Sequence, residues 1–162
     1  MEKAYFPMFV DIKGMKILVV GGGNIALRRV KTLLEFGADV QVIAPELCAG
    51  MKELAAEGKI RSELREYMEG DAESAGIVIA ATDSRAVNRA VQEECRHRKI
   101  PVNVADDRDS CDFYFPSVVI TDEAVIGINS GGEDPGRVKR VRSGIEALYG
   151  NRRDYSDDRI EK

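Results

Sequence analysis

The chain of 162 residues has no tryptophan, one histidine and three cysteines, and each shortage argues against a class of site. A single histidine, His97, rules out metal centres built from several histidines, and we predict no metal site. Cys48, Cys95 and Cys111 are odd in number and form no C-x-x-C pair. A disulfide framework is therefore not expected, and a reducing, cytoplasmic environment fits best.

Long apolar runs and several catalytic motifs are also lacking. No stretch approaches the length of a membrane span, and the N-terminal residues have no signal-peptide pattern, so we expect no membrane partner. The net charge of −4 argues against non-specific binding of nucleic acid. The sequence contains no G-x-S-x-G elbow, no G-K-[ST] phosphate loop and no tyrosine followed four residues later by lysine.

What the chain does contain is a glycine turn between an apolar run and a helical pattern. The buried strand Lys16–Val20 leads into Gly21-x-Gly23-x-x-Ala26, which is the dinucleotide-binding fingerprint in its alanine form. Gly21 permits the tight turn, Gly23 lets the backbone approach a pyrophosphate, and Ala26 lets the helix pack close to the strand. The sequence therefore predicts a dinucleotide at the N-terminus of this helix.

Strands and helices alternate regularly after this turn. The pattern predicts an α/β fold, a Rossmann-like doubly wound parallel sheet, over residues 1–112. We expect a helix from Asn24 to Gly37 and another over Glu46–Glu57, and a third starting near Ser84. The expected strands after the first are Val40–Ala44, a polar strand with a loop within Ile60–Tyr67, Ile77–Ala81 and Val102–Ala105.

The pattern changes after residue 112. Two β-rich runs, Phe113–Ile120 and Ala124–Asn129, predict a hairpin, and a helix follows from Pro135 to near Gly150. A hairpin and one helix cannot form an independent core, so we expect residues 113–150 to bury their apolar face on a second copy, as a dimerisation and substrate region of a homodimer. Residues 151–162 form a charged tail.

Polar residues follow three of the predicted strands. The second strand ends in Val42-Ile-Ala-Pro-Glu46, with no acid at the strand end itself and no arginine for a 2′-phosphate, so NAD is favoured over NADP. Glu46 either contacts the ribose or lies in the first turn of the next helix. Thr82 and Asp83 follow the central strand, where ligands of such sheets bind, although Asp83 or Ser84 could simply cap the next helix. Asp106 heads an acidic loop on the same edge and is either a general acid–base group or a solvated loop residue.

Basic residues gather in three clusters. They are either solvated helix faces or the receptors of a substrate with several carboxylates. The clusters are Arg28, Arg29 and Lys31; Arg96, Arg98 and Lys99; and Arg137, Lys139, Arg140 and Arg142. His97 lies beside the second cluster, near a helix C-terminus, where we expect a surface role.

An ordered series of motifs then gives the chain a family likeness. The run from Phe6 to Ala26 resembles the opening of the siroheme synthase N-terminal domain, the precorrin-2 dehydrogenase. Further similar segments follow in order: Leu33-Leu-x-x-Gly-Ala38, Ala80-Ala-Thr-Asp83, Asn103-Val-Ala-Asp106, Asp112-Phe-x-Phe-Pro116 and Ser130-Gly-Gly ahead of Pro135. Asp134 departs from the serine or threonine common in the family before that proline.

The resemblance implies NAD-dependent oxidation of precorrin-2 to sirohydrochlorin in siroheme biosynthesis, with Fe²⁺ insertion in some members. It implies that Asp106 is catalytic and that the family's dimer forms through the region after the nucleotide domain. The cofactor contacts it implies, together with those of the fingerprint and strand ends, are Gly21, Gly23, Asn24, Ile25, Pro45, Glu46 and Thr82. The residues expected near the tetrapyrrole are Asn103, Ser130, Gly131 and Gly132.

Two other functions compete with the dehydrogenase. One is a regulatory module that binds NAD without turnover, in which Asp106 is an ordinary loop residue. The other is a dedicated ferrochelatase that keeps the nucleotide fold without using it. The Asn103–Pro116 segment and the Ser130-Gly-Gly loop favour the dehydrogenase, since a sensor has no need of them.

Overall fold

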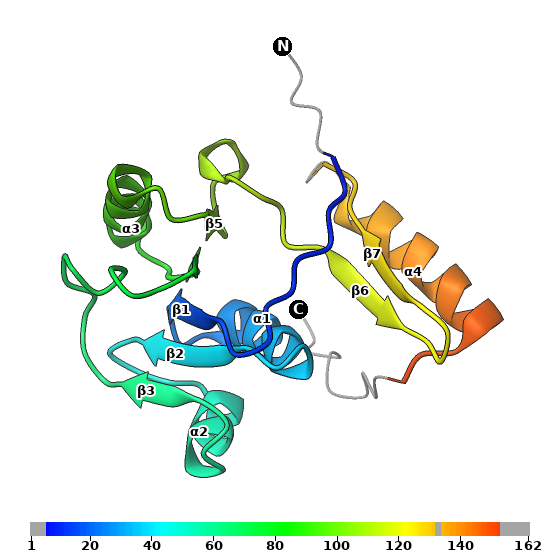
Figure 1. Ribbon diagram of the computed structural model, residues 1–162, viewed down its shortest axis with the longest axis horizontal. Helices are drawn as coiled ribbons and strands as arrows, with labels where there is room; N and C mark the ends of the chain where they lie inside the picture. The colour runs from blue at the N-terminus through cyan, green and yellow to red at the C-terminus, as the bar shows by residue number, and fades with distance from the viewer. Residues whose placement is uncertain (1–5, 132–133, 153–162) are drawn as a thin grey trace. The chain divides into compact units, whose positions relative to one another are not determined.

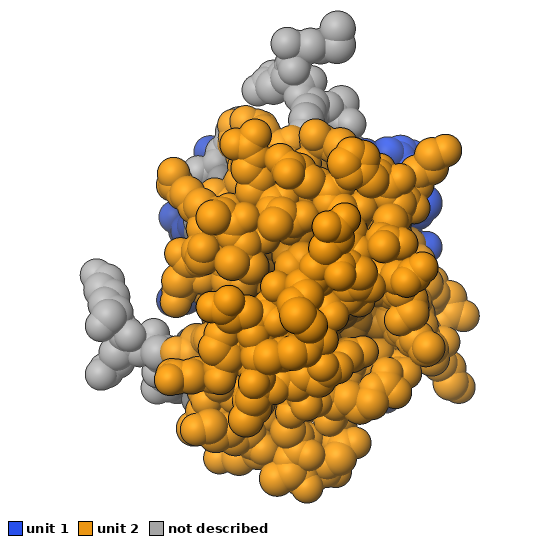
Figure 2. Space-filling model, turned by 90° about the vertical axis from the view of Figure 1, so that its left-hand side faces the viewer, with its two compact units in different colours: residues 1–9, 114–162 blue, residues 10–113 orange. Residues whose placement is uncertain are grey.

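The computed structural model describes residues 6–131 and 134–152 and divides the chain into two compact units. Unit 2 comprises residues 10–113, and unit 1 contains residues 6–9 and 114–152 of the described chain (Figures 1 and 2). The predicted division after residue 112 lies one residue from the end of unit 2, but residues 6–9, predicted to belong to the nucleotide domain, fall in unit 1. The functions assigned to the two parts stay predictions. Most of the predicted tail lies outside the described residues.

Unit 2 is built on a five-stranded parallel sheet in the order β3-β2-β1-β4-β5 (Figure 1). Val19 at its centre pairs in register with Val42 on one side and Ile79 on the other, and none of these side chains is exposed. The β-branched runs form strands because both faces of a parallel sheet are covered. The strands are β1 (Lys16–Val20), β2 (Asp39–Ile43), β3 (Arg61–Glu63), β4 (Ile77–Ala80) and β5 (Val102–Val104).

Three helices cover the sheet of unit 2. They are α1 (Asn24–Glu35), α2 (Ala49–Ala56) and α3 (Arg85–Arg98). Strand order runs one way from β1 to β3 and the other way from β4 to β5, so right-handed crossovers place α1 and α2 on one face and α3 on the other. The order reverses between β1 and β4, and ligands of this fold bind outside the carboxyl ends of the strands at that point.

The long connection from β3 to β4 is fixed to α3 by a buried carboxylate. Glu94 accepts hydrogen bonds from the Tyr67 hydroxyl, from the backbone N–H of Gly70 and from Nε of Arg98. Burial by itself would raise the pKa of Glu94, but these hydrogen bonds outweigh it and lower the pKa. Within the connection, Arg65 holds both carboxylate oxygens of Asp71, at 2.7 and 2.8 Å.

Unit 1 contains an antiparallel hairpin, β6 (Ser117–Ile120) with β7 (Val125–Ile128), and the helix α4 (Pro135–Tyr149). The turn is closed by the backbone N–H of Thr121 on the carbonyl of Ala124, at 2.9 Å, and by the Thr121 hydroxyl, which accepts from the turn's own N–H groups. The predicted hairpin and following helix are confirmed. Asp134 caps the helix by accepting from Arg137 N at 2.8 Å, as the family's usual serine or threonine would.

Two predicted element starts are wrong by three and four residues, and other ends differ by only one or two. The helix expected over 46–57 begins only at Ala49, because Pro45–Cys48 forms a loop whose last residue donates its N–H to the carbonyl of Gly22. The strand expected from Phe113 begins at Ser117, directly after Pro116, which has no N–H for a ladder. A short 3₁₀ helix, η1 (Arg108–Ser110), was not predicted; it is capped by the Asp107 carboxylate.

Candidate functional site

The glycine turn after β1 has three glycines, and they do not all serve the same purpose. Gly21 has φ +127°, and a Cβ there would lie 2.2 Å from the Ala81 carbonyl oxygen, so only glycine fits. A Cβ on Gly22 would lie 2.0 Å from the carbonyl oxygen of Glu46. A Cβ on Gly23 would meet nothing within 4 Å. The first two glycines are needed by the fold, whereas the third leaves open space at the turn.

The N-terminus of α1 opens onto that space. Gly23 occupies its N-cap position and supplies no side chain to cap the helix. The next two residues, Asn24 and Ile25, are exposed, and Ile25 is 54% accessible despite being apolar. Uncapped N–H groups and the positive end of the helix dipole favour an anion such as a pyrophosphate. A dinucleotide fits this turn.

The loop after β2 contains the two other predicted cofactor contacts, Pro45 and Glu46. Both are exposed and precede α2, so Glu46 is not a first-turn acid of that helix, and this alternative is wrong. The main chain of Glu46 lies over Gly22 instead. A role of the Glu46 carboxylate on a ribose stays a prediction.

Thr82, directly after β4, is bonded to Asn88 on α3. The backbone N–H and the hydroxyl of Thr82 both donate to Oδ1 of Asn88, at 3.1 and 2.8 Å. The Thr82 carbonyl accepts from Nδ2 of Asn88 at 3.0 Å. Asn88 is only 1% exposed, and Ser84 caps the helix that holds it. The capping interpretation is therefore correct for Ser84, and contact of Thr82 with a cofactor stays a prediction.

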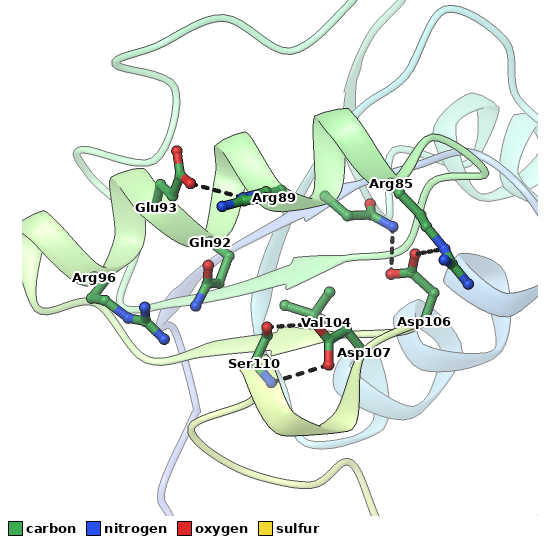
Figure 3. Close-up of a pocket in the computed structure, with 10 residues that line it drawn as sticks. Arg85, Arg89, Gln92, Glu93, Arg96, Val104, Asp106, Asp107 and Ser110 are labelled. Carbon is green, nitrogen blue, oxygen red and sulfur yellow. Dashed lines mark hydrogen bonds and ion pairs between the residues drawn. The ribbon is translucent and has the colours of Figure 1, made fainter.

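The second N–H of the same Asn88 amide holds Asp106. It donates to Oδ1 of Asp106 at 2.8 Å, while Oδ2 lies 3.9 Å from Nε of Arg85 (Figure 3). The Asp106 side chain is 32% exposed, so one carboxylate oxygen is fixed and the other faces outward with a loosely placed cation. Because a Gly21 Cβ would also lie 3.2 Å from Thr82 N, the glycine turn, Thr82, Asn88 and Asp106 form a continuous series at one sheet edge.

Asn103 is the second residue of β5 and pairs with Ile79 of β4. It is buried rather than presented to a ligand. Its Nδ2 donates to the Phe113 carbonyl at 2.8 Å and to the Cys111 sulfur at 3.4 Å, and the residue is 3% exposed. These bonds anchor the end of the acidic loop to β5, the strand that precedes Asp106, while Oδ1 of Asn103 is buried without a partner in the described part of the chain. A direct contact of Asn103 with substrate stays a prediction.

The remaining predicted substrate residues lie in unit 1. The Ser130 hydroxyl bonds with the backbone of Asp134, and Gly131 has φ +70° and donates its N–H to Oδ1 of Asn129 at 2.7 Å. The loop that they form leads directly into α4. Gly132 lies outside the described residues. The roles of all three with a tetrapyrrole stay predictions.

Other candidate groups have simpler places. His97 lies exposed in the last turn of α3, as expected. Within residues 6–131 and 134–152, no group of three histidine, cysteine, aspartate or glutamate side chains is arranged to hold a metal ion. In the same part of the chain, no helix has the length and apolar character needed to cross a membrane. All three cysteines are free thiols.

Sequence reasoning missed Asn88, which is the centre of the site. A polar amide in a helix is normally interpreted as solvent-exposed, and Asn88 has no motif around it. The available signal was spacing: Asn88 and Gln92 lie four residues apart beside the apolar positions Val91 and Cys95. Both amides are buried, so the helix has a polar flank within its covered face.

Comparisons with known proteins show the family of this chain. A family model described as putative NAD(P)-binding matches residues 8–117. Siroheme synthase of Pseudomonas fluorescens (strain Pf0-1) is 40% identical over 142 residues, which are 88% of this chain and 31% of that protein. A probable multifunctional siroheme biosynthesis protein of Ruminiclostridium josui is 41% identical over 149 residues, 88% of this chain and 28% of that protein. The chain thus spans about a third of the length of these curated relatives.

A solved structure extends the match over most of both chains. The precorrin-2 dehydrogenase SirC superposes with a TM-score of 0.78 and 30% sequence identity, covering 90% of this chain and 71% of that one. The Rossmann-like fold is confirmed by this likeness and by the sheet order. Through its putative NAD(P)-binding domain, the chain belongs to the siroheme synthase and precorrin-2 dehydrogenase family.

Proposed function

We propose that the chain is an NAD-dependent dehydrogenase that oxidises precorrin-2 to sirohydrochlorin in siroheme biosynthesis. The observation that carries the proposal is the Asp106 carboxylate, held by Asn88 at the same sheet edge as an open dinucleotide turn. The likeness to SirC, whose name gives this activity, and to siroheme synthases supports the same reaction.

NAD⁺ would be held at the N-terminus of α1, by the open turn at Gly23 and the exposed Asn24 and Ile25, with Pro45 and Glu46 near its ribose. Bound NAD⁺ supplies an acceptor for the hydride that leaves the reduced macrocycle. The absence of an arginine from the loop after β2 favours NAD over NADP.

Asp106 is the proton acceptor of the proposed reaction. Loss of two hydrogens from precorrin-2 releases one hydride and one proton, and a general base must take the proton. Oδ1 of Asp106 is occupied by the Asn88 amide, so Oδ2 is the oxygen that faces substrate. Asn88 uses both of its N–H groups and its oxygen within the site, and it therefore sets the orientation of the carboxylate.

We further infer a cytoplasmic homodimer. Unit 1 is a two-stranded sheet with one helix, which is too little to be stable alone, and Val125, Val141, Leu148 and Tyr149 expose apolar surface on it. A second copy of the same unit would cover these side chains. Three free cysteines fit a reducing compartment. Light scattering coupled to size exclusion tests the dimer, and a monomer at micromolar concentration contradicts it.

Incubation of the purified chain with precorrin-2, with and without NAD⁺, tests the activity. We expect NADH and the sirohydrochlorin absorbance spectrum only when NAD⁺ is present. Binding of NAD⁺ without turnover would favour the regulatory module. Addition of Fe²⁺ or Co²⁺ to the product tests metal insertion separately, since the names of the relatives extend to siroheme; metal insertion without oxidation would identify a ferrochelatase.

A further inference from the structure

A pocket of about 500 Å³ lies in unit 2 between α3 and the segment from Val104 to Ser110. Asp106 stands at one end of it, and the side chains of Gln92 and Arg96 point into it from the helix (Figure 3). Neither of these two residues belongs to the dinucleotide turn or is bonded to Asp106. The pocket therefore extends the site in a direction that the cofactor does not explain.

Gln92 is the most informative residue of the pocket. The residue as a whole is only 6% exposed, and its side chain lines the pocket. Its amide borders the pocket, where a ligand or water can bond it. An amide that is buried by its helix and faces only the pocket is suited to a ligand placed there.

The charges around the pocket leave cationic donors available. Glu93 accepts from Nε of Arg89 at 3.0 Å. Asp107 accepts from the Ser110 hydroxyl at 2.6 Å and from backbone N–H groups of η1, and these bonds hold the pKa of Asp107 below its usual range. Both acids are thus already engaged, whereas the Arg96 guanidinium has no ion-pair partner in the described part of the chain.

The donors that remain form a set suited to a carboxylate. The guanidinium of Arg96 offers a planar fork for two oxygens, and the Gln92 amide adds a further N–H beside it. Asn88, Gln92 and Arg96 follow one another at four-residue spacing on α3, so Gln92 is about 6 Å and Arg96 about 12 Å along the helix from the amide that holds Asp106. A substrate whose ring reacts at Asp106 would extend an acidic arm into this pocket.

We propose that this pocket is a subsite for a peripheral carboxylate of the tetrapyrrole, recognised by Arg96 and Gln92. The proposal rests on the proposed function, because that reaction provides a substrate with several carboxylate arms. It assigns the substrate to one residue of the three basic clusters, Arg96, and gives Gln92 a role that no motif indicated. The pyrophosphate of NAD⁺ is the other anion that such donors bind, and the experiment separates the two.

The test compares Arg96→Gln and Arg96→Lys with wild type, by steady-state kinetics and by absorbance titration with sirohydrochlorin. We expect KM for precorrin-2 and Kd for sirohydrochlorin to rise about tenfold in Arg96→Gln, equivalent to about 1.4 kcal/mol. KM and Kd of Arg96→Lys should lie between those of wild type and Arg96→Gln, because the lysine ammonium is a point charge and not a planar two-donor group. KM for NAD⁺ should not change. Lys52→Gln, an exposed lysine on α2, removes the same charge away from the pocket and should behave as wild type.

Gln92→Leu tests whether the amide of Gln92 serves a ligand or the fold, because only a structural role predicts a loss of thermal stability. If Gln92 serves a ligand, the apolar leucine side chain should leave the melting temperature at or above the wild-type value while weakening sirohydrochlorin binding at least threefold. A rise below twofold in Kd and KM for Arg96→Gln, with wild-type turnover intact, would overturn the subsite alone. An increase confined to KM for NAD⁺ would identify the pyrophosphate as the occupant and also overturn it. Absence of turnover in wild type would overturn the proposed function and, with it, this assignment.

Discussion

Replacement of Asn88 is the most direct test of how the site is held together. Its side chain makes four hydrogen bonds, to Thr82 N, Thr82 Oγ1, Thr82 O and Asp106 Oδ1, at 2.8 to 3.1 Å. At about 1 kcal/mol each, their loss in Asn88→Ala sets an upper figure near 4 kcal/mol. Asp106 is 32% exposed and can bond water instead, so we expect a loss of about 2–3 kcal/mol in the free energy of unfolding.

The kinetic effect should exceed the structural one. Without Asn88, Asp106 is free to change rotamer, and a misplacement of about 1 Å can cost on the order of 100-fold in rate. We expect kcat for precorrin-2 oxidation to fall by about 10- to 100-fold in the folded variant, with KM for NAD⁺ unchanged because the glycine turn is intact. Urea unfolding followed by far-ultraviolet circular dichroism suits a chain without tryptophan. Arg89→Ala, on the next residue, should stay within about 0.5 kcal/mol of wild type.

Asn88→Asp separates hydrogen bonding from simple packing. The shape of the side chain is kept, but a carboxylate oxygen replaces the N–H that faces Asp106, so two negative charges oppose each other. Protonation of either acid restores a donor, and the stability deficit of this variant should therefore shrink as the pH is lowered. Unfolding free energies of Asn88→Ala within 0.5 kcal/mol of wild type, together with wild-type kcat, would refute the positioning role. A pH-independent deficit in Asn88→Asp would show that charge repulsion with Asp106 is not its cause.

Three further outcomes follow from the same geometry. Gly23→Ala should keep the wild-type melting temperature, because its Cβ meets only open space, but titration should show a weaker affinity for NAD⁺. Gly22→Ala should lose about 1–3 kcal/mol of stability, because its Cβ would collide with the carbonyl of Glu46. Equal effects of the two substitutions would contradict this division. Asp106→Ala should lower kcat by 10²- to 10⁴-fold while fluorescence titration with NADH is unchanged, and retained turnover would remove the general base. The hydrogen bond from Arg65 lowers the pKa of Asp71 in the folded state. The stabilisation is therefore fully present above the unfolded-state pKa, near 4, and is lost as the pH falls through the lower folded-state pKa. In acid titrations monitored by circular dichroism, Asp71→Asn should lose less stability than wild type, and an identical acid transition would contradict the assignment.

Sequence patterns were sufficient for the elements of the fold because each pattern has a local cause. The β1 run and the glycine turn specify strand, turn and helix within a dozen residues, and Ser84 caps α3 as its position indicated. The start of α2 was wrong because a distant segment decides it. The loop before α2 is held open by Gly22, which lies 24 residues before Glu46 in the chain and cannot be inferred from the helical period.

The site was only half visible in the sequence for a related physical reason. Glycines and an acid at strand ends are recognisable, because the topology of a parallel sheet brings strand ends together. The proposed role of Asn88 depends on its hydrogen-bond partners, Thr82 directly after β4 and Asp106 in the loop after β5. A periodic pattern gives the face of a helix but not the groups opposite that face, so a buried amide is indistinguishable from an exposed one until the sheet is assembled.

The contact between Gly21 and the end of β4 joins these two halves. A Cβ on Gly21 would lie 2.2 Å from Ala81 O and 3.2 Å from Thr82 N. Because Gly21 has no Cβ, the ends of β1 and β4 can approach closely at the point where the strand order reverses. Thr82 N is one of the groups that fix Asn88, and Asn88 fixes Asp106. A side chain at position 21 would therefore displace the proposed proton acceptor as well as the dinucleotide. Gly21→Ala should accordingly impair binding of sirohydrochlorin as well as NAD⁺, while Gly23→Ala should impair NAD⁺ alone.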